Sequence, residues 1–278
     1  MDIKAFITSA LNEDIGTGDH STLACIDKSE VGKAVLKIKE AGILAGIEVA
    51  TEIFLMLEPD CQIQVFIEDG SRVSYGEIAF EVRAKVHTIL SAERLVLNIM
   101  QRMSGIATLT RRYVERIKEY PAHILDTRKT TPNFRWFEKQ AVVIGGGQNH
   151  RMGLYDMIML KDNHIDYCGS IENAIDKTKR YLAENQLDLK IEIEARSLED
   201  VRRILAHGGI HRIMLDNFTP EALAEAVQLI DRKYETEASG GINLDTIESY
   251  AKSQVDYISV GAIIHHAVSM DLSLKAVK

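Results

Sequence analysis

A concentration of basic side chains marks the middle of this sequence. Residues 123–166 read HILDTRKTTPNFRWFEKQAVVIGGGQNHRMGLYDMIMLKDNHID. The whole chain has 278 residues and a formal net charge of −8, so the number of cationic or protonatable side chains in this one segment is unusual: Arg128, Lys129, Arg135, His150, Arg151, Lys161 and His164. Arginine binds carboxylates and phosphates through two parallel hydrogen bonds, and lysine acts as a mobile point charge. The segment therefore predicts a site for a polyanionic ligand.

The elements that must position these residues are short apolar runs separated by helical windows. The runs are HILD, MIMLK, KIEIEA, RIMLD, ETEAS and YISVG, and the helical windows cover residues 171–182, 198–206, 220–230 and 244–252. Apolar strands separated by helices are typical of a parallel sheet. We therefore predict an incomplete (β/α) barrel over residues 121–268, one strand short of eight.

In such barrels the active site lies at the carboxyl ends of the strands. The predicted strand ends carry Asp126, Lys161, Glu194, Asp216, Ser239 and Gly261. Strand ends that emerge into water also tolerate charge, but Glu192 and Glu194 share one face of KIEIEA and would both line the barrel. The carboxyl ends of the last two predicted strands carry small residues, which can bind a phosphate or form an ordinary turn: Ser239, Gly240, Gly241, Gly261 and Ala262.

The first hundred residues have a different pattern. Helical spacing of apolar residues covers 3–11 and 47–57, and strict alternation covers 33–40, 62–69 and 77–86. A long apolar helix follows from Thr88 to about residue 117. We predict an N-terminal α+β sandwich domain with a long linking helix over residues 1–120, and a catalytic barrel domain over 121–278 whose final helix can pack back on the first domain.

Composition excludes several classes of protein. No apolar run approaches the roughly 20 residues that span a bilayer, and the start MDIKAFITSALNED lacks a signal-peptide layout. The scattered Cys25, Cys61 and Cys168 indicate a reducing compartment, and we expect a cytoplasmic protein without disulfides. The acidic balance argues against nucleic acid. Because no cysteine and histidine cluster has metal-site spacing, we expect any metal to be Mg²⁺ on carboxylates.

The loop between the first two barrel strands contains two further signals. Thr130, Thr131 and Pro132 are typical of the start of a helix, here one that includes Trp136. The triple glycine at 145–147 lacks the ending of a nucleotide-binding P-loop. We expect it to be a flexible connection that positions Asn149, His150 and Arg151.

The order of the motifs adds a family resemblance. DTRKTTP, GGGQNHRMGL, LKDNH, IEIE, LDN, EASGGI and ISVGA resemble the quinolinate phosphoribosyltransferases, as do EDIGTGD, AGILAG and ERLVLNIMQRMSGIAT in the first half. The resemblance implies a sandwich domain, an incomplete barrel and a homodimer or larger homo-oligomer with a shared active site. It also implies transfer of phosphoribose from 5-phosphoribosyl-1-pyrophosphate to quinolinate with decarboxylation, giving nicotinate mononucleotide, pyrophosphate and CO₂ in NAD biosynthesis.

The resemblance also implies roles for individual residues. Those for quinolinate are Arg102 (from the partner subunit), Thr127, Arg128, Lys129, His150, Arg151 and Lys161. Those for 5-phosphoribosyl-1-pyrophosphate are Lys129, Lys161, Asn163, His164, Glu194, Asp216, Ser239, Gly240, Gly241, Gly261 and Ala262. The implied catalytic residues are Lys129, Lys161, Glu194 and Asp216, and the two carboxylates would also hold Mg²⁺.

One departure from the family pattern and three alternatives follow. Asn133 stands where we expect glycine, and asparagine tolerates the left-handed conformation. The alternatives are a related protein associated with molybdate transport, a Schiff-base aldolase that uses a buried Lys161, and a non-catalytic anion-binding protein. Asn149 disfavours the first, because we expect that residue to be replaced in the molybdate-associated group.

Overall fold

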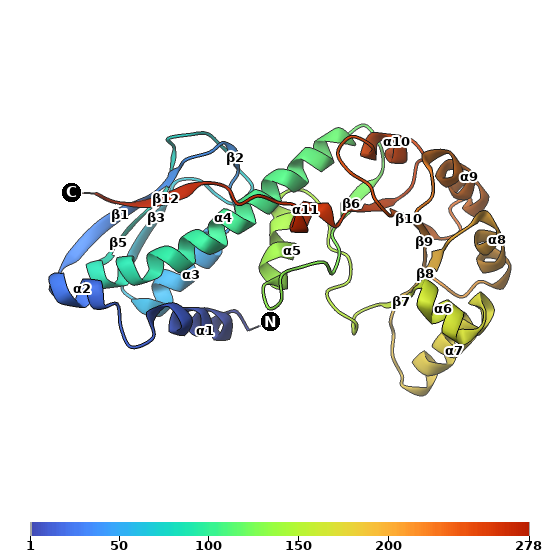
Figure 1. The fold of residues 1–278 in the computed structure, drawn as a ribbon, viewed down its shortest axis with the longest axis horizontal. Coiled ribbons are helices and arrows are strands. Elements are labelled where there is room, and N and C mark those ends of the chain that lie inside the picture. Colours follow the sequence, from blue (N-terminus) through green and yellow to red (C-terminus); the bar gives the residue numbers. More distant parts are fainter. Residues whose placement is uncertain (1, 278) are drawn as a thin grey trace. The chain divides into compact units, whose positions relative to one another are not determined.

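The computed structural model describes residues 2–277, which form two compact units. The first unit contains residues 1–111, 131–146 and 266–278, and the second contains residues 112–130 and 147–265. The boundary between them therefore differs from the single break that we predicted at residues 120 and 121. Figure 1 labels the elements of both units.

The first unit is built on an antiparallel sheet in the order β12-β1-β5-β3. Its strands are β1 (Val31–Ile38), β3 (Gln62–Val65), β5 (Ile78–Lys85) and β12 (Leu272–Val277), and a separate pair consists of β2 (Gly42–Ile43) and β4 (Arg72–Val73). The alternation predicted for β1 is confirmed, since Ala34, Leu36 and Ile38 are all buried. The predicted antiparallel pairing of β3 with β5 is also confirmed.

The helices of the first unit pack their apolar faces together and on the sheet. They are α1 (Ile3–Ile15), α2 (His20–Cys25), α3 (Ile47–Leu57), α5 (Arg135–Ile144) and most of α4 (Val86–Arg116). Phe54 of α3 meets Phe80 of β5 with ring centroids 6.2 Å apart. This buried aromatic pair fixes α3 against the sheet, as the predicted sandwich requires.

Two segments that we assigned to the barrel domain belong to the first unit. Helix α5 packs there because Phe137 lies against Phe6 of α1, with centroids 4.7 Å apart. Gly145 lies so close to α4 that an added Cβ would be 2.7 Å from the carbonyl oxygen of Ala107. The triple glycine is therefore a close-packing position and not only a flexible connection. The predicted final helix is wrong: its residues form strand β12, which pairs with β1 and places Leu36 opposite Leu274.

The second unit contains a parallel sheet in the order β6-β11-β10-β9-β8-β7. Its strands are β6 (His123–Leu125), β7 (Ile158–Leu160), β8 (Ile191–Ala195), β9 (Arg212–Asp216), β10 (Glu235–Ser239) and β11 (Tyr257–Ser259). Each predicted strand is confirmed, but the sheet has six strands and not seven. Gln148 makes only a single parallel bridge to Leu125, beside the edge strand β6.

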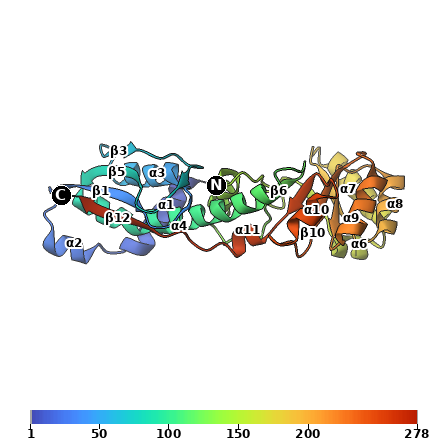
Figure 2. The same cartoon turned by 90° about the horizontal axis from the view of Figure 1, so that it is seen from above.

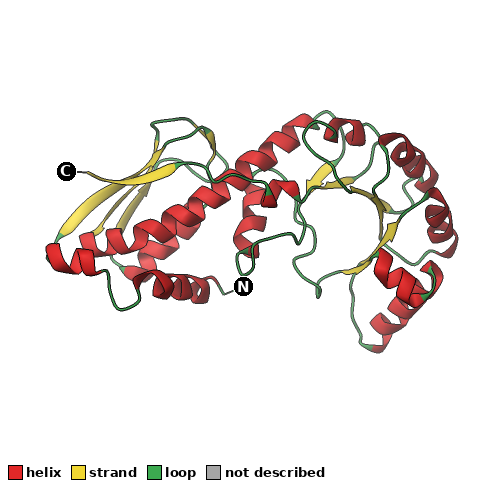
Figure 3. Cartoon of the chain, viewed as in Figure 1, coloured by secondary structure: helices red, strands yellow, loops and turns green. Residues whose placement is uncertain are grey.

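The helices of the second unit surround the curved sheet on its outer side (Figures 1 and 3). They are α6 (Asp162–Cys168), α7 (Ile171–Glu184), α8 (Leu198–His207), α9 (Pro220–Ile230) and α10 (Ile247–Ala251), and a short helix α11 (Ala262–His265) follows β11. In the view turned by 90°, α8 and α9 again lie beyond β10 (Figure 2). The strands therefore bury apolar residues such as Ile193 and Leu215 on the helix side, and the alternate residues face the inside of an incomplete barrel.

Candidate active site

The predicted strand-end residues lie at one edge of the parallel sheet. Lys161 directly follows β7, Glu194 is the last but one residue of β8, and Asp216 ends β9. The register pairs Asp216 with Ser239 at the end of β10, and Gly261 is the second residue after β11. The parallel register thus brings together residues that are separated by about one hundred positions in the sequence.

Glu194 and Asp216 form an acidic pair on adjacent strands. Burial raises the pKa of Glu194, the nearby charge of Asp216 raises it further, and Lys161 acts in the opposite direction. Asn217 donates from its side-chain amide to Asp216 Oδ2 over 2.5 Å. Two neighbouring carboxylates that repel each other are a suitable oxygen donor set for a hard divalent cation such as Mg²⁺.

Two glycines at this edge of the sheet lie in close contact with side chains from other loops. An added Cβ on Gly240 (φ +101°) would lie 2.2 Å from the side-chain oxygen of Asn217. At Gly261 it would lie 3.1 Å from Cδ of Lys129, so the lysine side chain extends directly over this glycine. The structure therefore brings Lys129 to the end of β11, next to the segment predicted to hold a phosphate.

Arg128 and Arg151 form a pair of like charges. Burial lowers the pKa of Arg151, and the charge of Arg128 lowers it further. Arg151 donates from Nη1 to the carbonyl oxygen of Met157 over 3.2 Å. Among residues 2–277, no acceptor is within hydrogen-bond reach of the buried Nε of Arg128. A pair of arginines with a buried unsatisfied donor is suited to binding a ligand that carries two anionic groups.

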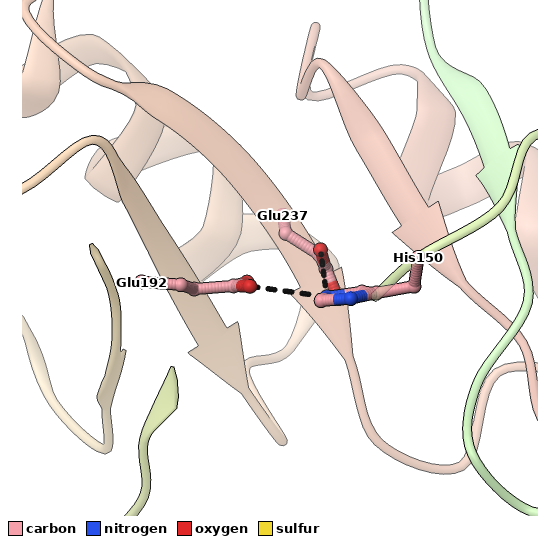
Figure 4. Close-up of side chains that lie close together, drawn as sticks. All are labelled: His150, Glu192 and Glu237. Atoms are coloured by element: carbon pink, nitrogen blue, oxygen red, sulfur yellow. Dashed lines mark ion pairs between the residues drawn. The ribbon is translucent and has the colours of Figure 1, made fainter. Parts of the chain in front are cut away.

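His150 lies inside the barrel between two carboxylates (Figure 4). Its Nε2 is 3.0 Å from Glu192 Oε2 and 3.2 Å from Glu237 Oε2, and the imidazole is only 4% exposed. Arg212 completes the group, because its Nη1 donates to the same Glu237 oxygen over 3.0 Å. The guanidinium of Arg212 also lies 4.1 Å from the ring centroid of Tyr257. We call His150, Glu192, Arg212 and Glu237 the interior network.

The ionisation of the interior network follows from its burial. Burial and the charge of Glu237 raise the pKa of Glu192 to about 7. Burial also acts to raise the pKa of Glu237, but His150 and Arg212 outweigh it, so this pKa lies below its ordinary value. Burial disfavours a charged His150, yet the two carboxylates raise its pKa to about 9. The amide of Arg151 donates to Nδ1 over 2.6 Å and so opposes a proton there. Both observations support a proton on Nε2.

His150, Glu192 and Glu237 also have the composition of a metal site, with possible ligand atoms within 4.8 Å of one another. Two contacts disfavour this interpretation. Arg212 already neutralises Glu237, and a ring proton on Nε2 leaves no lone pair there for a metal. The three side chains are better described as an ion-pair network.

A cavity of about 410 Å³ lies beside the interior network. Its lining includes His150, Arg151, Lys190 and Arg212. Lys190 precedes β8 and Arg212 begins β9, so this cavity lies at the amino ends of the strands, opposite Glu194 and Asp216. Glu235 lies 3.0 Å from Arg212 and 4.0 Å from Lys190, so this one carboxylate offsets part of the positive charge of the lining.

Comparison with known proteins decides the family. The model of the quinolinate phosphoribosyl transferase C-terminal domain matches residues 106–275, and the model of the N-terminal domain matches residues 19–104. The chain belongs to the quinolinate phosphoribosyltransferase family.

Individual relatives agree over nearly the whole chain. The mitochondrial quinolinate phosphoribosyltransferase (decarboxylating) 2b of Nicotiana tabacum is 42% identical over 99% of this chain and 82% of its own. The probable nicotinate-nucleotide pyrophosphorylase (carboxylating) of Bacillus subtilis is 39% identical over 99% of this chain and 93% of its own. The crystal structure of NadC from Streptococcus pyogenes superimposes with a TM-score of 0.93 at 38% identity, over 99% of this chain and 97% of that one.

Arg102, for which the family resemblance implies a role across subunits, is held within the first unit. Its Nη2 donates to Glu138 Oε1 over 2.8 Å, and its Nη1 donates to the carbonyl oxygen of Ala267 over 2.8 Å. Glu138 is fully buried and also accepts bonds from the amide and hydroxyl groups of Thr131. A single carboxylate therefore joins Arg102 to the DTRKTTP segment.

Asn133, which follows this segment, adopts φ +61°, which confirms that its position requires a left-handed residue.

The remaining predicted residues of the family site lie in the loop after β6 and at the start of α6, in the second unit. The Thr127 hydroxyl accepts from the amide of Lys129 over 3.1 Å. The amide of Lys161 donates to His164 Nδ1 over 3.0 Å, and the side chains of Lys161, Asn163 and His164 are exposed. Because the aldolase alternative required a buried lysine, the exposure of Lys161 removes the reason for it.

Three members of the interior network and Glu138 were not among the predicted site residues. Glu192, Arg212 and Glu237 belong to the inward-facing alternation of β8, β9 and β10, which places them on the same face of the sheet as Glu194, Asp216 and Ser239. Charged residues at period two within otherwise apolar strands are the signal that identifies them. Glu138 has no comparable signal, because a glutamate in the first turn of a helix is common.

Among residues 2–277 the structure contains no helix long and apolar enough to cross a membrane.

Proposed function

We propose that this protein transfers the phosphoribosyl group of 5-phosphoribosyl-1-pyrophosphate to quinolinate and removes one carboxylate. The products are nicotinate mononucleotide, pyrophosphate and CO₂. The observation that carries the proposal is the Arg128 and Arg151 pair, with its buried unsatisfied donor, in a chain of this family. A pyridine dicarboxylate supplies the two negative groups that such a pair lacks.

The charged edge of the barrel accounts for the first step. The C1–O bond to pyrophosphate breaks, its electron pair leaves with pyrophosphate, and the ring nitrogen of quinolinate bonds to C1. Positive charge develops on the ribose, where Glu194 and Asp216 can stabilise it. Lys129 and Lys161 would contact the departing pyrophosphate and the dicarboxylate. The 5-phosphate would bind at the ends of the last two strands, to Ser239, Gly240, Gly241, Gly261 and Ala262. Asn163 and His164, which follow Lys161 in the sequence, would also contact 5-phosphoribosyl-1-pyrophosphate.

The second step needs no additional protein group as an electron acceptor. Once ribosylated, the ring nitrogen is positive and stabilises the electron pair that remains on C2 when CO₂ leaves. C2 then takes up a proton. The contribution of the protein is to hold the ring by Arg128 and Arg151 while the departing carboxylate is partly desolvated.

Glu194 and Asp216 are the residues that would hold Mg²⁺, because a cation would relieve the mutual repulsion of these two carboxylates. When bound, the ion would neutralise pyrophosphate oxygens.

A shared active site is part of the proposal. Arg102 would reach the barrel site of the partner subunit in a homodimer or a larger homo-oligomer, with Glu138 fixing its orientation. Mixing an Arg102→Ala subunit with a Glu194→Gln subunit should then restore part of the activity, because one site of each hybrid dimer is intact. Failure of mixed subunits to recover any activity, with exchange verified, would contradict the shared site.

The test of the function itself is direct. Purified protein with quinolinate, 5-phosphoribosyl-1-pyrophosphate and Mg²⁺ should release nicotinate mononucleotide and CO₂ in equal amounts. No product would favour the molybdate-associated alternative, and saturable binding of both compounds without turnover would favour a non-catalytic anion-binding protein.

We propose a cytoplasmic location because all three cysteines are free thiols, which suits a reducing compartment.

A further inference from the structure

The interior network is not part of the site that the family resemblance implies, apart from His150. Glu237 and Glu192 are fully buried and come from different strands, β10 and β8, while Arg212 comes from β9 between them. Burying several charges costs free energy even when they are paired, and an apolar core at the same positions is often at least as stable. A purely structural role is therefore a weak explanation for the network.

The contacts of His150 show what the network holds. Its imidazole is fixed at Nε2 by the two carboxylates, and its Nδ1 accepts from the main-chain amide of Arg151 over 2.6 Å. The main-chain amide of His150 donates to Asp126 Oδ1 over 2.9 Å. The main chain that carries Arg151 is thus attached on one side to the end of β6 and on the other, through an imidazole, to β8 and β10.

We propose that Glu192, Glu237 and Arg212 are positioning residues that hold the His150 imidazole as a rigid support for the Arg151 main chain, and so fix the Arg151 guanidinium in the dicarboxylate clamp. His150 acts within the barrel as part of this support, and its Nε2 is directed to the carboxylates. The inference rests on the proposed function of Arg128 and Arg151.

Strand β10 provides a matched control. Glu235 and Glu237 both pair with Arg212, through Oε2 atoms 3.0 Å from its guanidinium, but only Glu237 contacts His150. Replacement of either residue by glutamine removes one charge next to Arg212 and keeps the side-chain shape. Only the change at Glu237 should disturb the support of Arg151.

The experiment compares wild-type protein, Glu237→Gln and Glu235→Gln in steady-state turnover with quinolinate and then 5-phosphoribosyl-1-pyrophosphate as the varied substrate. Glu237→Gln should raise KM for quinolinate by about 10- to 100-fold, since small displacements of a binding group have effects of this size. Its KM for 5-phosphoribosyl-1-pyrophosphate should not change, and Glu235→Gln should resemble wild type in both. In an Arg151→Gln background, adding Glu237→Gln should have no further effect on KM for quinolinate.

Several outcomes would overturn the inference. A folded Glu237→Gln with the wild-type KM for quinolinate would do so, as would equal effects of Glu235→Gln and Glu237→Gln, or additive effects of Glu237→Gln and Arg151→Gln. If Glu237→Gln does not fold, Glu192→Gln tests the same point, because Glu192 contacts His150 at 3.0 Å from a different strand. Absence of turnover by wild-type protein would reject the proposed function together with the inference, whereas wild-type turnover with an unchanged KM in the variants would reject the inference alone.

Discussion

The inner face of the barrel sheet carries two groups of charged residues that differ in how their charges are balanced. In the interior network, buried carboxylates lie beside an imidazole and a guanidinium: Glu237 lies 3.2 Å from His150 Nε2 and 3.0 Å from Arg212 Nη1. In two other pairs, Arg128 with Arg151 and Glu194 with Asp216, charges of one sign lie together instead. Arg128 lowers the pKa of Arg151, and Asp216 raises the pKa of Glu194. The first group pairs its charges within the protein, although among residues 2–277 both oxygens of Glu192 and Oε1 of Glu237 lack a hydrogen bond. The second group is arranged for charges that a ligand would bring.

This difference suggests different roles for the two groups: the interior network supports the structure, and the like-charged residues bind a ligand. A network whose charges are already paired gains little from an anion, and its removal should mainly affect folding or geometry. A group of like charges destabilises the free protein and gains from a ligand of opposite charge. Substitutions in the two groups should therefore differ in whether stability or binding changes.

The largest effect should come from breaking the interior network. Arg212→Ala leaves the fully buried Glu237 without its guanidinium partner. We expect the free energy of unfolding to fall by about 3–5 kcal/mol. Chemical denaturation measures this change. A decrease below about 1 kcal/mol, the range of exposed ion pairs, would show that the network is not what we describe.

In the arginine pair, Arg151→Ala should weaken quinolinate binding by about 2–4 kcal/mol, because a buried carboxylate would lose its charged partner. The free energy of unfolding should change little. Calorimetric titration with quinolinate measures the effect, and Arg196→Ala is the control, since Arg196 pairs with Asp166 on the exposed surface. Unchanged affinity in Arg151→Ala would remove this residue from the clamp.

The acidic pair predicts a pH dependence. Because the pKa of Glu194 is raised in the folded protein, ionisation of this carboxyl destabilises the fold, and its favourable contribution is lost as pH rises through the folded-state pKa. Glu194→Gln should therefore raise Tm at neutral pH and lose activity, while the gain in Tm should disappear below about pH 4, where the carboxyl is protonated in both states. Thermal unfolding over this pH range tests the sign. A lower Tm at neutral pH would contradict the description of the pair.

The smallest effect should come from a charge pair outside both groups. Glu172 of α7 lies 2.7 Å from Arg203 of α8, and the hydrogen bonds from Arg203 lower the pKa of Glu172 to about 2. Both side chains are substantially exposed, so solvent and salt screen the interaction. Glu172→Gln should change the free energy of unfolding by less than about 1 kcal/mol. A larger loss in denaturation experiments would mean that exposed pairs also support this fold.

Much of the barrel could be predicted because its signals are local. Each of the six parallel strands follows from a short apolar run, and the C-terminal ends of β7, β8 and β9 show directly where Lys161, Glu194 and Asp216 lie. The segment from Thr131 to Gly146 could not be placed in this way, because its assignment depends on the contacts of Phe137 and Gly145 with α1 and α4. The return of β12 to β1 likewise depends on pairing across more than two hundred residues.

By itself the sequence determined the order of strands and helices, the family, and the residues that reach the carboxyl edge, because periodicity and motifs are properties of neighbouring positions. Only the tertiary structure decided which charges neutralise one another. Glu192, Arg212 and Glu237 are far apart in the chain, and their meeting with His150 depends on the register of parallel strands and on the curvature of the sheet. Electrostatic energy depends on distance and burial, and both arise only when the barrel has formed.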